Sequence, residues 1–245
     1  MFGLFKKRRD EQPKLNFEAI AVDMHSHVLP GIDDGAQNPQ ESIELIKTMM
    51  SAGIKKIIAT PHVMNDYYRN TPESIKSALA VLKAELAEQQ IDIPVEASAE
   101  YFFDEVFMEL VEKNELLPMG KNYILFEFSF VSPPPVFIPT IIKLKDMGYI
   151  PILAHPERYP YYTLDQYKNL KQWGCMLQLN TISLTGYYGR ETKLCAEELV
   201  DNQLVDFISS DMHATRHADA FVRSLEMPYV QRLLAGGYLC NKALL

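Results

Sequence analysis

Short groups of histidine and acidic residues recur along the chain, and their spacing is typical of metal ligands. His25 and His27 stand two residues apart in the string Asp-Met-His-Ser-His that begins at Asp23. In an extended segment, residues two apart point to the same side, so these imidazoles can bind one ion while Asp23 orients an imidazole from behind. Asp211 and His213 repeat the spacing near the end of the chain. Both strings therefore predict metal binding.

Further candidates of the same chemical kind occur between these two strings. They are Asp33, Asp34, His62, Glu100, Glu127 and His155. Glu127 stands inside the otherwise apolar run 123–130, where a buried carboxylate is costly unless it is paired or metal-bound. His217 is set apart in an expected loop, and we interpret it as a structural residue or as a support for a ligand. For each residue taken alone, a capping or other structural role is the alternative.

The candidate ligands offer only nitrogen and oxygen donors. Such a set is typical of manganese, iron or zinc in catalytic sites and not of a structural zinc site with thiolate ligands. The candidates outnumber the ligands of one tetrahedral ion, so we expect two or three divalent ions. Clusters of this kind usually hydrolyse phosphate esters, because a bound water loses its proton near neutral pH and attacks phosphorus in line.

Two arginines are candidates for binding the phosphate oxygens in such a reaction. Arg158 follows His155 by three residues, and Arg216 follows His213 by three. The planar guanidinium group can hold two phosphate oxygens at once, which stabilises the charge that spreads over them during transfer. A surface salt bridge is the alternative role for each arginine.

The elements that must position these residues are read from seven short apolar runs that alternate with helical patterns. The runs are 17–23, 54–60, 93–99, 123–128, 150–154, 175–179 and 206–209. The helical patterns cover 38–53, 71–90, 104–113, 136–147, 164–173 and 191–201, with one more at the C-terminus. This alternation favours a parallel sheet with helices outside, and seven units are one fewer than in the eight-fold (β/α) barrel. An open doubly wound sheet is the alternative, although no glycine-rich phosphate loop is present.

The candidate ligands follow the C-terminal ends of these runs, where parallel α/β folds build their active sites. Two long loops are expected at the same end, 61–70 and 180–190, and each carries two tyrosines followed by an arginine. These residues are Tyr67, Tyr68, Arg69, Tyr187, Tyr188 and Arg190. They can contact the ring and phosphate of a substrate or simply pack against the rim. The prolines 133–135 are expected to form a rigid wall.

Charge and cysteine content exclude several other classes of protein. The 245 residues carry a net charge of −8, which argues against a protein that wraps nucleic acid. Residues 1–16 form a basic leader, and residues 17–245 form one domain; the leader is a solvated tail or a weak contact to a membrane surface or partner. No apolar run reaches the length of a membrane span. Three cysteines, none followed six residues later by arginine, exclude a cysteine phosphatase loop and favour free thiols in the cytoplasm.

Five motifs together resemble the polymerase and histidinol phosphatase (PHP) superfamily, and within it the bacterial capsule-type tyrosine phosphatases of the CpsB/CapC branch. They are DMHSHVLPGIDDG at 23–35, TPH at 60–62, AEY at 99–101, HPERY at 155–159 and SDMH at 210–213. The resemblance spans nearly the whole chain from about Ala21, and the motifs occur in the order of the family. The basic leader is a departure that the barrel motifs do not require.

The resemblance implies a single-domain, distorted (β/α)7 TIM-like barrel that holds three metal ions, usually manganese. Its ligand sets would be His25, His27, Glu100 and Asp211 for one ion, Glu100, Glu127 and His155 for a second, and Asp34, His62 and His213 for a third. Glu100 would bridge two ions, and the choice between Asp33 and Asp34 is open.

The activity that the resemblance implies is hydrolysis of phosphotyrosine on the tails of bacterial tyrosine kinases that control capsule or exopolysaccharide synthesis. Another PHP phosphoesterase, such as a histidinol-phosphate phosphatase or a nuclease, is an alternative, although the acidic charge disfavours the nuclease. A non-catalytic metal-binding regulator of polysaccharide assembly is a second alternative. An amidohydrolase-like enzyme is a third, although no lysine is evident at a strand end.

Overall fold

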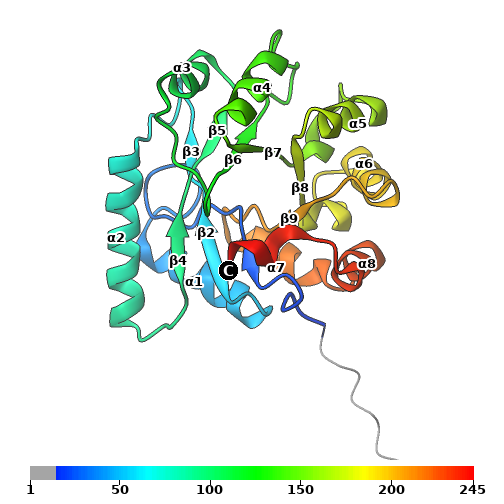
Figure 1. Cartoon of the computed structure of the whole chain (residues 1–245). Helices are drawn as coiled ribbons and strands as arrows, with labels where there is room; N and C mark the ends of the chain where they lie inside the picture. The colour runs from blue at the N-terminus through cyan, green and yellow to red at the C-terminus, as the bar shows by residue number, and fades with distance from the viewer. Residues whose placement is uncertain (1–14) are drawn as a thin grey trace, which may run out of the picture.

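Nine parallel strands form the centre of the molecule in the computed structural model, which describes residues 15–245. All but the last two residues of the predicted leader, 1–16, therefore lie outside the described residues. The strands are β1 (Val22–Asp23), β2 (Lys56–Ala59), β3 (His62–Val63), β4 (Val95–Ala97), β5 (Glu100–Phe102), β6 (Tyr123–Glu127), β7 (Ile150–Ala154), β8 (Met176–Asn180) and β9 (Phe207–Ser209). They pair in two sheets, β1-β2-β4 and β3-β5-β6-β7-β8-β9 (Figure 1).

Two of the predicted strands are interrupted and continue after a break, which gives nine strands from seven positions. β2 stops before Thr60 and the chain resumes as β3, while β4 stops before Ser98 and resumes as β5. Ser98 N donates to Ala59 O at 2.8 Å and Glu100 N donates to Pro61 O at 3.1 Å, so backbone pairing continues across both breaks. The breaks bring His62 and Glu100 into register as strand partners.

Strand order follows chain order through both sheets, whereas a doubly wound sheet reverses its order at a switch point. The open doubly wound alternative is therefore wrong. The segments after the first and last strands also meet, because His27 N donates to Met212 O and Asp211 N donates to His25 O, both at 2.9 Å. The prediction of a single parallel α/β domain with seven strand positions is confirmed.

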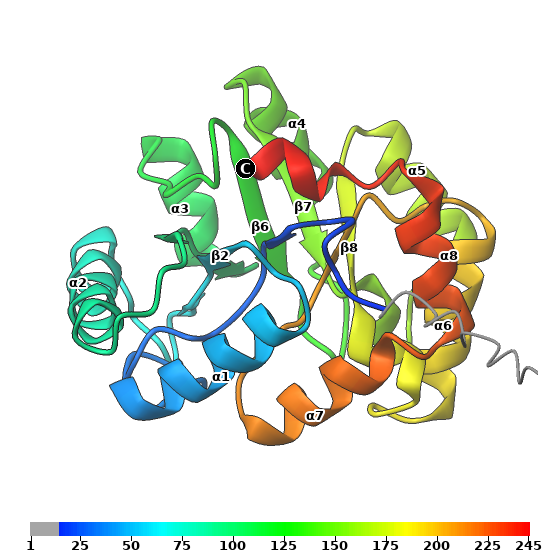
Figure 2. The ribbon, with the colours of Figure 1, turned by 90° about the horizontal axis from the view of Figure 1, so that it is seen from below.

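Helices cover the outside of the strands, as Figures 1 and 2 show. The α-helices are α1 (Pro39–Ser51), α2 (Pro72–Glu88), α3 (Glu105–Lys113), α4 (Ile138–Asp146), α5 (Leu164–Gln172), α6 (Arg190–Asp201), α7 (Thr215–Ser224) and α8 (Pro228–Gly236). Three 3-10 helices are η1 (Pro156–Arg158), η2 (Thr181–Thr185) and η3 (Cys240–Leu244). Asn38 and Thr71 cap α1 and α2 through their side chains, as predicted. Within residues 15–245, none of these helices has the length and hydrophobicity that a membrane span requires.

The expected strand 17–23 is wrong over most of its length. Only Val22–Asp23 is a strand, because Ala21 has a φ of 60° and its N–H donates to Phe17 O in a turn. Phe17 instead packs on Phe221 of α7 with ring centroids 4.4 Å apart, which ties the start of the domain to its end.

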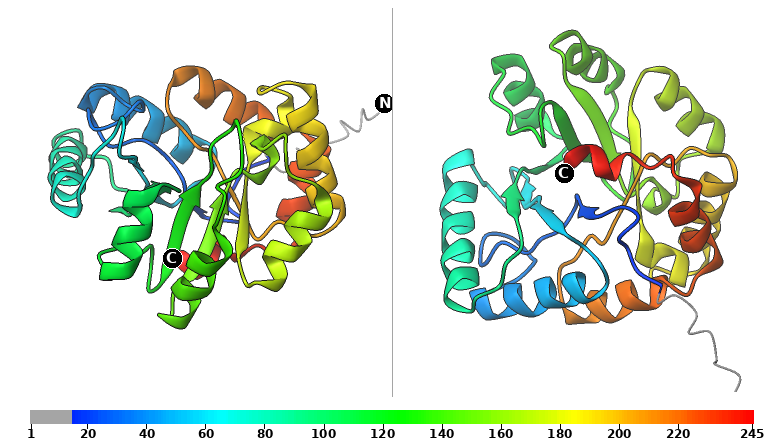
Figure 3. Two further views of the ribbon diagram at one scale, coloured as in Figure 1. Left: turned by 90° about the horizontal axis from the view of Figure 1, so that it is seen from above. Right: turned by 60° about the horizontal axis from the view of Figure 1, so that its bottom comes forward.

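The single C-terminal helix expected from the sequence is two helices, α7 and α8. Pro228 occupies the first position of α8, and the residue before a proline avoids the helical region, so the chain breaks there. The chain then ends in η3, whose Asn241 bonds to Val22 O and Ile208 O at 3.0 and 2.8 Å. Figures 2 and 3 show this red segment lying across the strands. The C-terminal segment therefore covers one end of the strands and leaves the other end for a site.

Candidate metal centre

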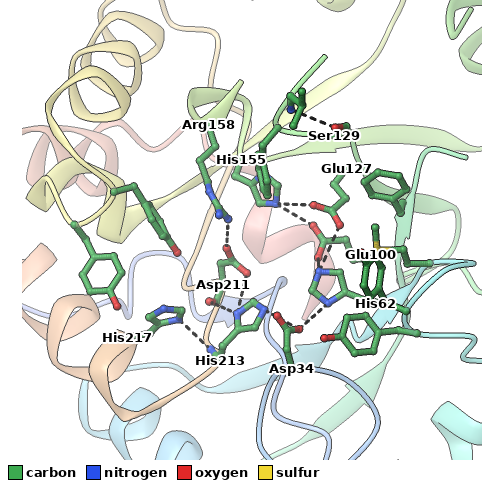
Figure 4. Close-up of a pocket in the computed structure, with 18 of the residues that line it drawn as sticks. Asp34, His62, Glu100, Glu127, Ser129, His155, Arg158, Asp211, His213 and His217 are labelled. Atoms are coloured by element: carbon green, nitrogen blue, oxygen red, sulfur yellow. Dashed lines mark hydrogen bonds and ion pairs between the residues drawn. The ribbon is translucent and has the colours of Figure 1, made fainter. Parts of the chain in front are cut away.

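A cavity of about 640 Å³ opens where the C-terminal ends of the strands meet. Seven of the nine predicted ligands line it (Figure 4): Asp34, His62, Glu100, Glu127, His155, Asp211 and His213. The other two, His25 and His27, are fully buried beneath it, and their Nε2 atoms lie 3.1 and 3.3 Å from Glu100 Oε2. The structure thus brings all nine residues together, although they come from segments far apart in the sequence.

The backbone turns sharply at two of these residues. His155 follows β7 with a φ of 32°, and Asp211 follows β9 with a φ of 51°. Side chains other than glycine rarely adopt these left-handed conformations, which cost roughly 1–3 kcal/mol each and cluster at functional sites. The strain is one reason to regard this end of the barrel as the functional end.

The arrangement of His25 and His27 leaves two lone pairs facing each other. His25 Nδ1 donates to Gln178 Oε1 and His27 Nδ1 donates to Asp33 Oδ2, both at 2.8 Å. When neutral, each imidazole therefore carries its proton on Nδ1 and leaves Nε2 as an acceptor. The two Nε2 atoms lie only 3.2 Å apart. Two acceptors at this distance repel unless a proton or a metal cation lies between them. Burial lowers the pKa of His25 and of His27, but Glu100 and Asp33 beside them outweigh it and raise both, so the pair favours positive charge here and fits a divalent metal.

Glu100 lies at the centre of the imidazoles. Its Oε1 lies 3.1 Å from His155 Nε2, and its Oε2 lies 3.4 Å from His62 Nε2 in addition to the two buried histidines. Oε2 is buried and accepts no hydrogen bond of good geometry from the residues described. Burial alone would raise the pKa of Glu100, but His25 and the other imidazoles outweigh it and hold that pKa well below its usual range. An ionised, buried oxygen without a donor is what a metal ligand requires.

Glu127 also requires positive charge beside it, but its pKa is shifted upward, whereas that of Glu100 is shifted downward. Burial, together with the charge of Glu100, raises the pKa of Glu127 to about 8. Its Oε1 lies 3.4 Å from His62 Nε2 and its Oε2 lies 3.7 Å from His155 Nε2. A bound cation would compensate the crowding of the two carboxylates and favour the ionised form of Glu127.

The third group joins Asp34 to two histidines. Asp34 Oδ1 lies 3.2 Å from His62 Nδ1 and 3.6 Å from His213 Nε2. Burial and the neighbouring His27 lower the pKa of His213 to about 4, so its imidazole is neutral and able to bind a metal. His155 and His62 also have buried Nδ1 atoms with no hydrogen-bond partner among the described residues.

The choice between the two adjacent aspartates has a geometric answer. Asp33 is buried away from the cavity, where its Oδ2 accepts from His27 Nδ1 and from His62 N at 3.1 Å. Asp34 faces the cavity. Gly35 permits this turn, because a Cβ there would lie 2.0 Å from His27 O. Asp34 therefore remains the predicted ligand, and Asp33 orients the His27 ring.

Among residues 15–245, ligand atoms within 4.8 Å of one another form three groups, which are His25, His27 and Glu100; His27, Asp34, His62 and His213; and His62, Glu100 and Glu127. Three groups agree in number with the three ions that the resemblance implies. The members of the groups differ from the implied ligand sets. The group with Glu100 and Glu127 contains His62 and not His155, and His27 belongs to two groups. The residues fit a cluster of divalent ions, and the assignment of each ligand to an ion stays a prediction.

The expectation that Asp23 orients an imidazole is wrong. Its carboxylate accepts from Ser209 Oγ at 2.7 Å and from Ser210 N at 2.9 Å, so it holds the end of β9 and not a ring. Gln178 of β8 orients His25 instead. Sequence reasoning missed Gln178 because an amide in a strand gives no sign of what it faces.

Two more functional candidates were missed by sequence reasoning. Asn180 ends β8 and donates from Nδ2 to Asp211 Oδ2 at 2.6 Å. Glu157 is buried in η1, where its Oε1 accepts from Asn180 N at 3.0 Å and from Ser183 Oγ at 2.7 Å. Glu157 thereby fixes the backbone that presents Asn180. The only sequence signal was their position at strand ends.

Arg158 enters the cavity between two aromatic rings. Its guanidinium carbon lies 4.3 Å from the ring centroid of Phe130 and 4.3 Å from that of Tyr188, and Nη1 lies 3.3 Å from Asp211 Oδ2. Burial alone would lower the pKa of Arg158, but Asp211 raises it, so the group stays cationic. Arg216 also lines the cavity, from the exposed side of α7.

His217 is in α7 and not in the loop predicted for it. Its Nδ1 accepts a hydrogen bond from His213 N at 3.3 Å, and its ring meets that of Tyr187 edge-on. It therefore supports the segment that carries His213, in agreement with the interpretation as a supporting residue.

The two tyrosine segments are only partly loops. The first contains β3 and a tight turn, and the second contains η2. Their tyrosines line the cavity, but the arginines do not: Arg69 donates to Asn65 O at 2.6 Å, and Arg190 begins α6. The prolines 133–135 do not line the cavity either, so the predicted proline wall is wrong; Ser129, Phe130 and Val131 form that side.

Comparison with known proteins places this geometry in a family. A family model described as capsular polysaccharide synthesis, CpsB/CapC, matches residues 21–232. The chain is 34% identical to the tyrosine-protein phosphatase YwqE of Bacillus subtilis (strain 168) over 195 residues, which cover 78% of this chain and 77% of that protein. It is 26% identical to the tyrosine-protein phosphatase CpsB of Streptococcus pneumoniae, over 78% of this chain and 82% of that protein.

A solved structure gives the same result in three dimensions. It comes from a study of YwqE from Bacillus subtilis and CpsB from Streptococcus pneumoniae, described there as unique metal-dependent tyrosine phosphatases. The TM-score is 0.81 at 30% sequence identity, and the match covers 91% of this chain and 93% of that chain. Motifs, fold and relatives agree: the chain belongs to the CpsB/CapC family of capsular polysaccharide synthesis proteins.

Proposed function

We propose that this protein is a metal-dependent protein-tyrosine phosphatase. The observation that carries the proposal is the pair of facing Nε2 atoms of His25 and His27, 3.2 Å apart beside an ionised Glu100, at the floor of a cavity with aromatic and arginine walls. The floor fits divalent ions and the walls fit a phosphorylated phenol. The relatives named as tyrosine-protein phosphatases support the same activity.

The proposed metal content is two or three divalent ions, with manganese as the native metal and iron or zinc as the alternatives. The three groups of ligand atoms and the absence of sulfur among them support this content. When bound, the ions supply a water activated near neutral pH and neutralise charge on the phosphate.

The chain's own residues bind and orient the substrate. Arg158 is held in place by Phe130 and Tyr188, so its fork is preorganised to bind phosphate oxygens. Arg216 adds a second cation at the rim. Tyr68 lies beside His62, with ring centroids 5.5 Å apart, where it can stack on a substrate ring.

No residue is needed as a strong acid for the leaving group. A tyrosine phenol has a pKa of about 10, so the phenolate leaves much more readily than an aliphatic alkoxide. The same reasoning predicts preference for aryl over alkyl phosphates.

The proposed physiological substrate is the phosphorylated tail of a bacterial tyrosine kinase that regulates capsule or exopolysaccharide synthesis. The family description and the aromatic walls of the cavity support a polysaccharide-linked phosphotyrosine protein. A cytoplasmic location is proposed as well, supported by three free cysteines. The proposed role of the basic leader, residues 1–16, is at most a weak contact with a membrane surface.

The test is a phosphatase assay on a phosphotyrosine peptide with metal-stripped protein, repeated after manganese, iron or zinc is restored. We expect no turnover without metal and turnover with manganese. Absence of turnover with every metal, when binding of the metals is demonstrated, would show a non-catalytic metal-binding protein. Equal rates on histidinol phosphate would point to a general PHP phosphoesterase.

A further inference from the structure

A second cavity of about 710 Å³ lies beside the metal centre, and the mechanism does not use it. We call it the apolar groove. It lies between β3 and β5, the N-terminal end of α2, and α3, elements that stand together in Figure 1. Its floor is made by the buried side chains Val63, Ile75 and Tyr101, and its sides include the half-buried Val106 and Leu110 of α3. An apolar groove of this size suits an apolar side chain.

A narrow ridge separates the apolar groove from the metal centre. The ridge is the turn 64–68, closed by two hydrogen bonds: Met64 N donates to Tyr68 O, and Tyr68 N donates to Met64 O, both at 2.9 Å. Tyr67 and Tyr68 face the cavity of the metal centre, whereas Asn65 lines the groove, and Met64 lines both. The two cavities are thus neighbours that share the side chain of Met64 as a wall.

The polypeptide chain of a protein substrate must pass over the walls of the cavity, and the ridge is one of these walls. The metal centre accepts the phosphotyrosine side chain, so the residues on either side of it leave the cavity over its walls. Tyr67, a residue that is 74% exposed, lies on the ridge. An extended polypeptide advances about 3.3 Å per residue, and paired strands lie about 4.8 Å apart, so a side chain within about four residues of the phosphotyrosine reaches across a ridge of two strands.

We propose that the apolar groove binds an apolar side chain of the same substrate polypeptide, within a few residues of the phosphotyrosine. The proposal rests on the proposed phosphatase activity and adds the sequence class of the substrate. The charges at the groove do not favour a charged ligand of either sign, because the basic Arg69 and the acidic Glu73 and Glu115 all line it. The apolar floor and the position of the groove directly beside the substrate cavity, across Met64, favour an apolar side chain of the substrate.

The experiment measures kcat/KM on phosphotyrosine peptides in which each position from four residues before to four residues after the phosphotyrosine carries leucine or glycine. We expect leucine at one position to raise kcat/KM about tenfold over glycine, because the groove buries that side chain. Leu110→Glu should abolish this preference. Val106→Thr, which keeps the shape of the side chain and adds a hydroxyl, should reduce the leucine preference. This milder variant keeps the test valid if Leu110→Glu does not fold.

Both variants should hydrolyse free phosphotyrosine, which has no flanking residues, at the wild-type rate. Val81→Glu, on the exposed face of α2, is the matched control and should leave the peptide preference intact. A wild-type enzyme without leucine preference at any position overturns the proposal, as does a preference that survives in both variants. A wild-type protein that is an oligomer in solution, together with a Leu110→Glu variant that is a monomer, would also overturn the proposal, because the groove would then be an interface between copies. If the wild-type enzyme does not hydrolyse free phosphotyrosine or any phosphotyrosine peptide, the result would instead contradict the phosphatase activity itself.

Discussion

Asn180 Nδ2 donates a hydrogen bond of 2.6 Å to Asp211 Oδ2, and this bond joins the end of β8 to the segment after β9. The same oxygen lies 3.3 Å from Arg158 Nη1, so Asp211 presents its other oxygen, Oδ1, to His25 Nε2 at 3.4 Å. Asn180 in turn accepts from Gln178 Nε2 at 2.9 Å. One buried amide chain thus orients a carboxylate, an imidazole and an arginine together.

The substitution Asn180→Ala tests this network. Loss of the amide frees Asp211 Oδ2 from one of its two donors, so we expect manganese affinity to fall about 10–100-fold. Titration of the metal-stripped protein with manganese measures the change. The matched control is Asn202→Ala, because Asn202 is exposed and its side chain donates to Glu198 O, outside the metal centre. An unchanged manganese affinity in Asn180→Ala would show that metal binding by Asp211 does not depend on its hydrogen bond with Asn180.

Removal of the metal has an expected effect on stability as well as on activity. Ligands that bind only the folded state stabilise it, so a chelator should lower the thermal midpoint, and manganese should restore it. His27→Ala should lose bound metal, turnover and the midpoint shift together. His217→Ala should keep its metal, because the His217 ring contacts the His213 backbone and tyrosine rings. Elemental analysis and calorimetry measure these effects, and full turnover by His27→Ala would refute the metal centre.

Arg158→Lys tests the guanidinium fork without removing the positive charge. A lysine cannot hold two phosphate oxygens in one plane or stack equally between Phe130 and Tyr188, so we expect kcat/KM to fall about 10–100-fold. Steady-state kinetics on free phosphotyrosine measure the loss. Arg190→Lys, at the exposed start of α6, should behave like the wild type. Equal kinetics for both variants would assign Arg158 a structural role.

Gly35→Ala tests the close approach that turns Asp34 into the cavity. The added Cβ would lie 2.0 Å from His27 O, so the backbone must move, at a cost of about 1–3 kcal/mol in the free energy of unfolding. The shift should also weaken metal binding, because Asp33 and Asp34 both move with the turn. Denaturant unfolding and metal titration measure the two effects; a variant with wild-type stability would show that the turn adapts freely.

The sequence by itself determined the elements and the chemistry of the site. Apolar runs, turn residues and caps such as Asn38 are local signals, so the alternation of strands and helices was predictable. The positions of His25, His62 and Glu100 after apolar runs also followed, because parallel strands bring their C-terminal ends together. The strand 17–23 was predicted wrongly because a positive φ at Ala21 overrides its apolar pattern.

Only the tertiary structure decided which atoms face each other. Gln178 meets His25 across 153 positions of sequence, and Ser209 meets Asp23 across 186. No local pattern records such contacts, because they depend on how the two sheets bring the ends of distant strands together. The orientation of Asp34 toward the cavity, the stacking of Phe130 and Tyr188 on Arg158 and the ridge beside the apolar groove depend in the same way on packing between distant segments.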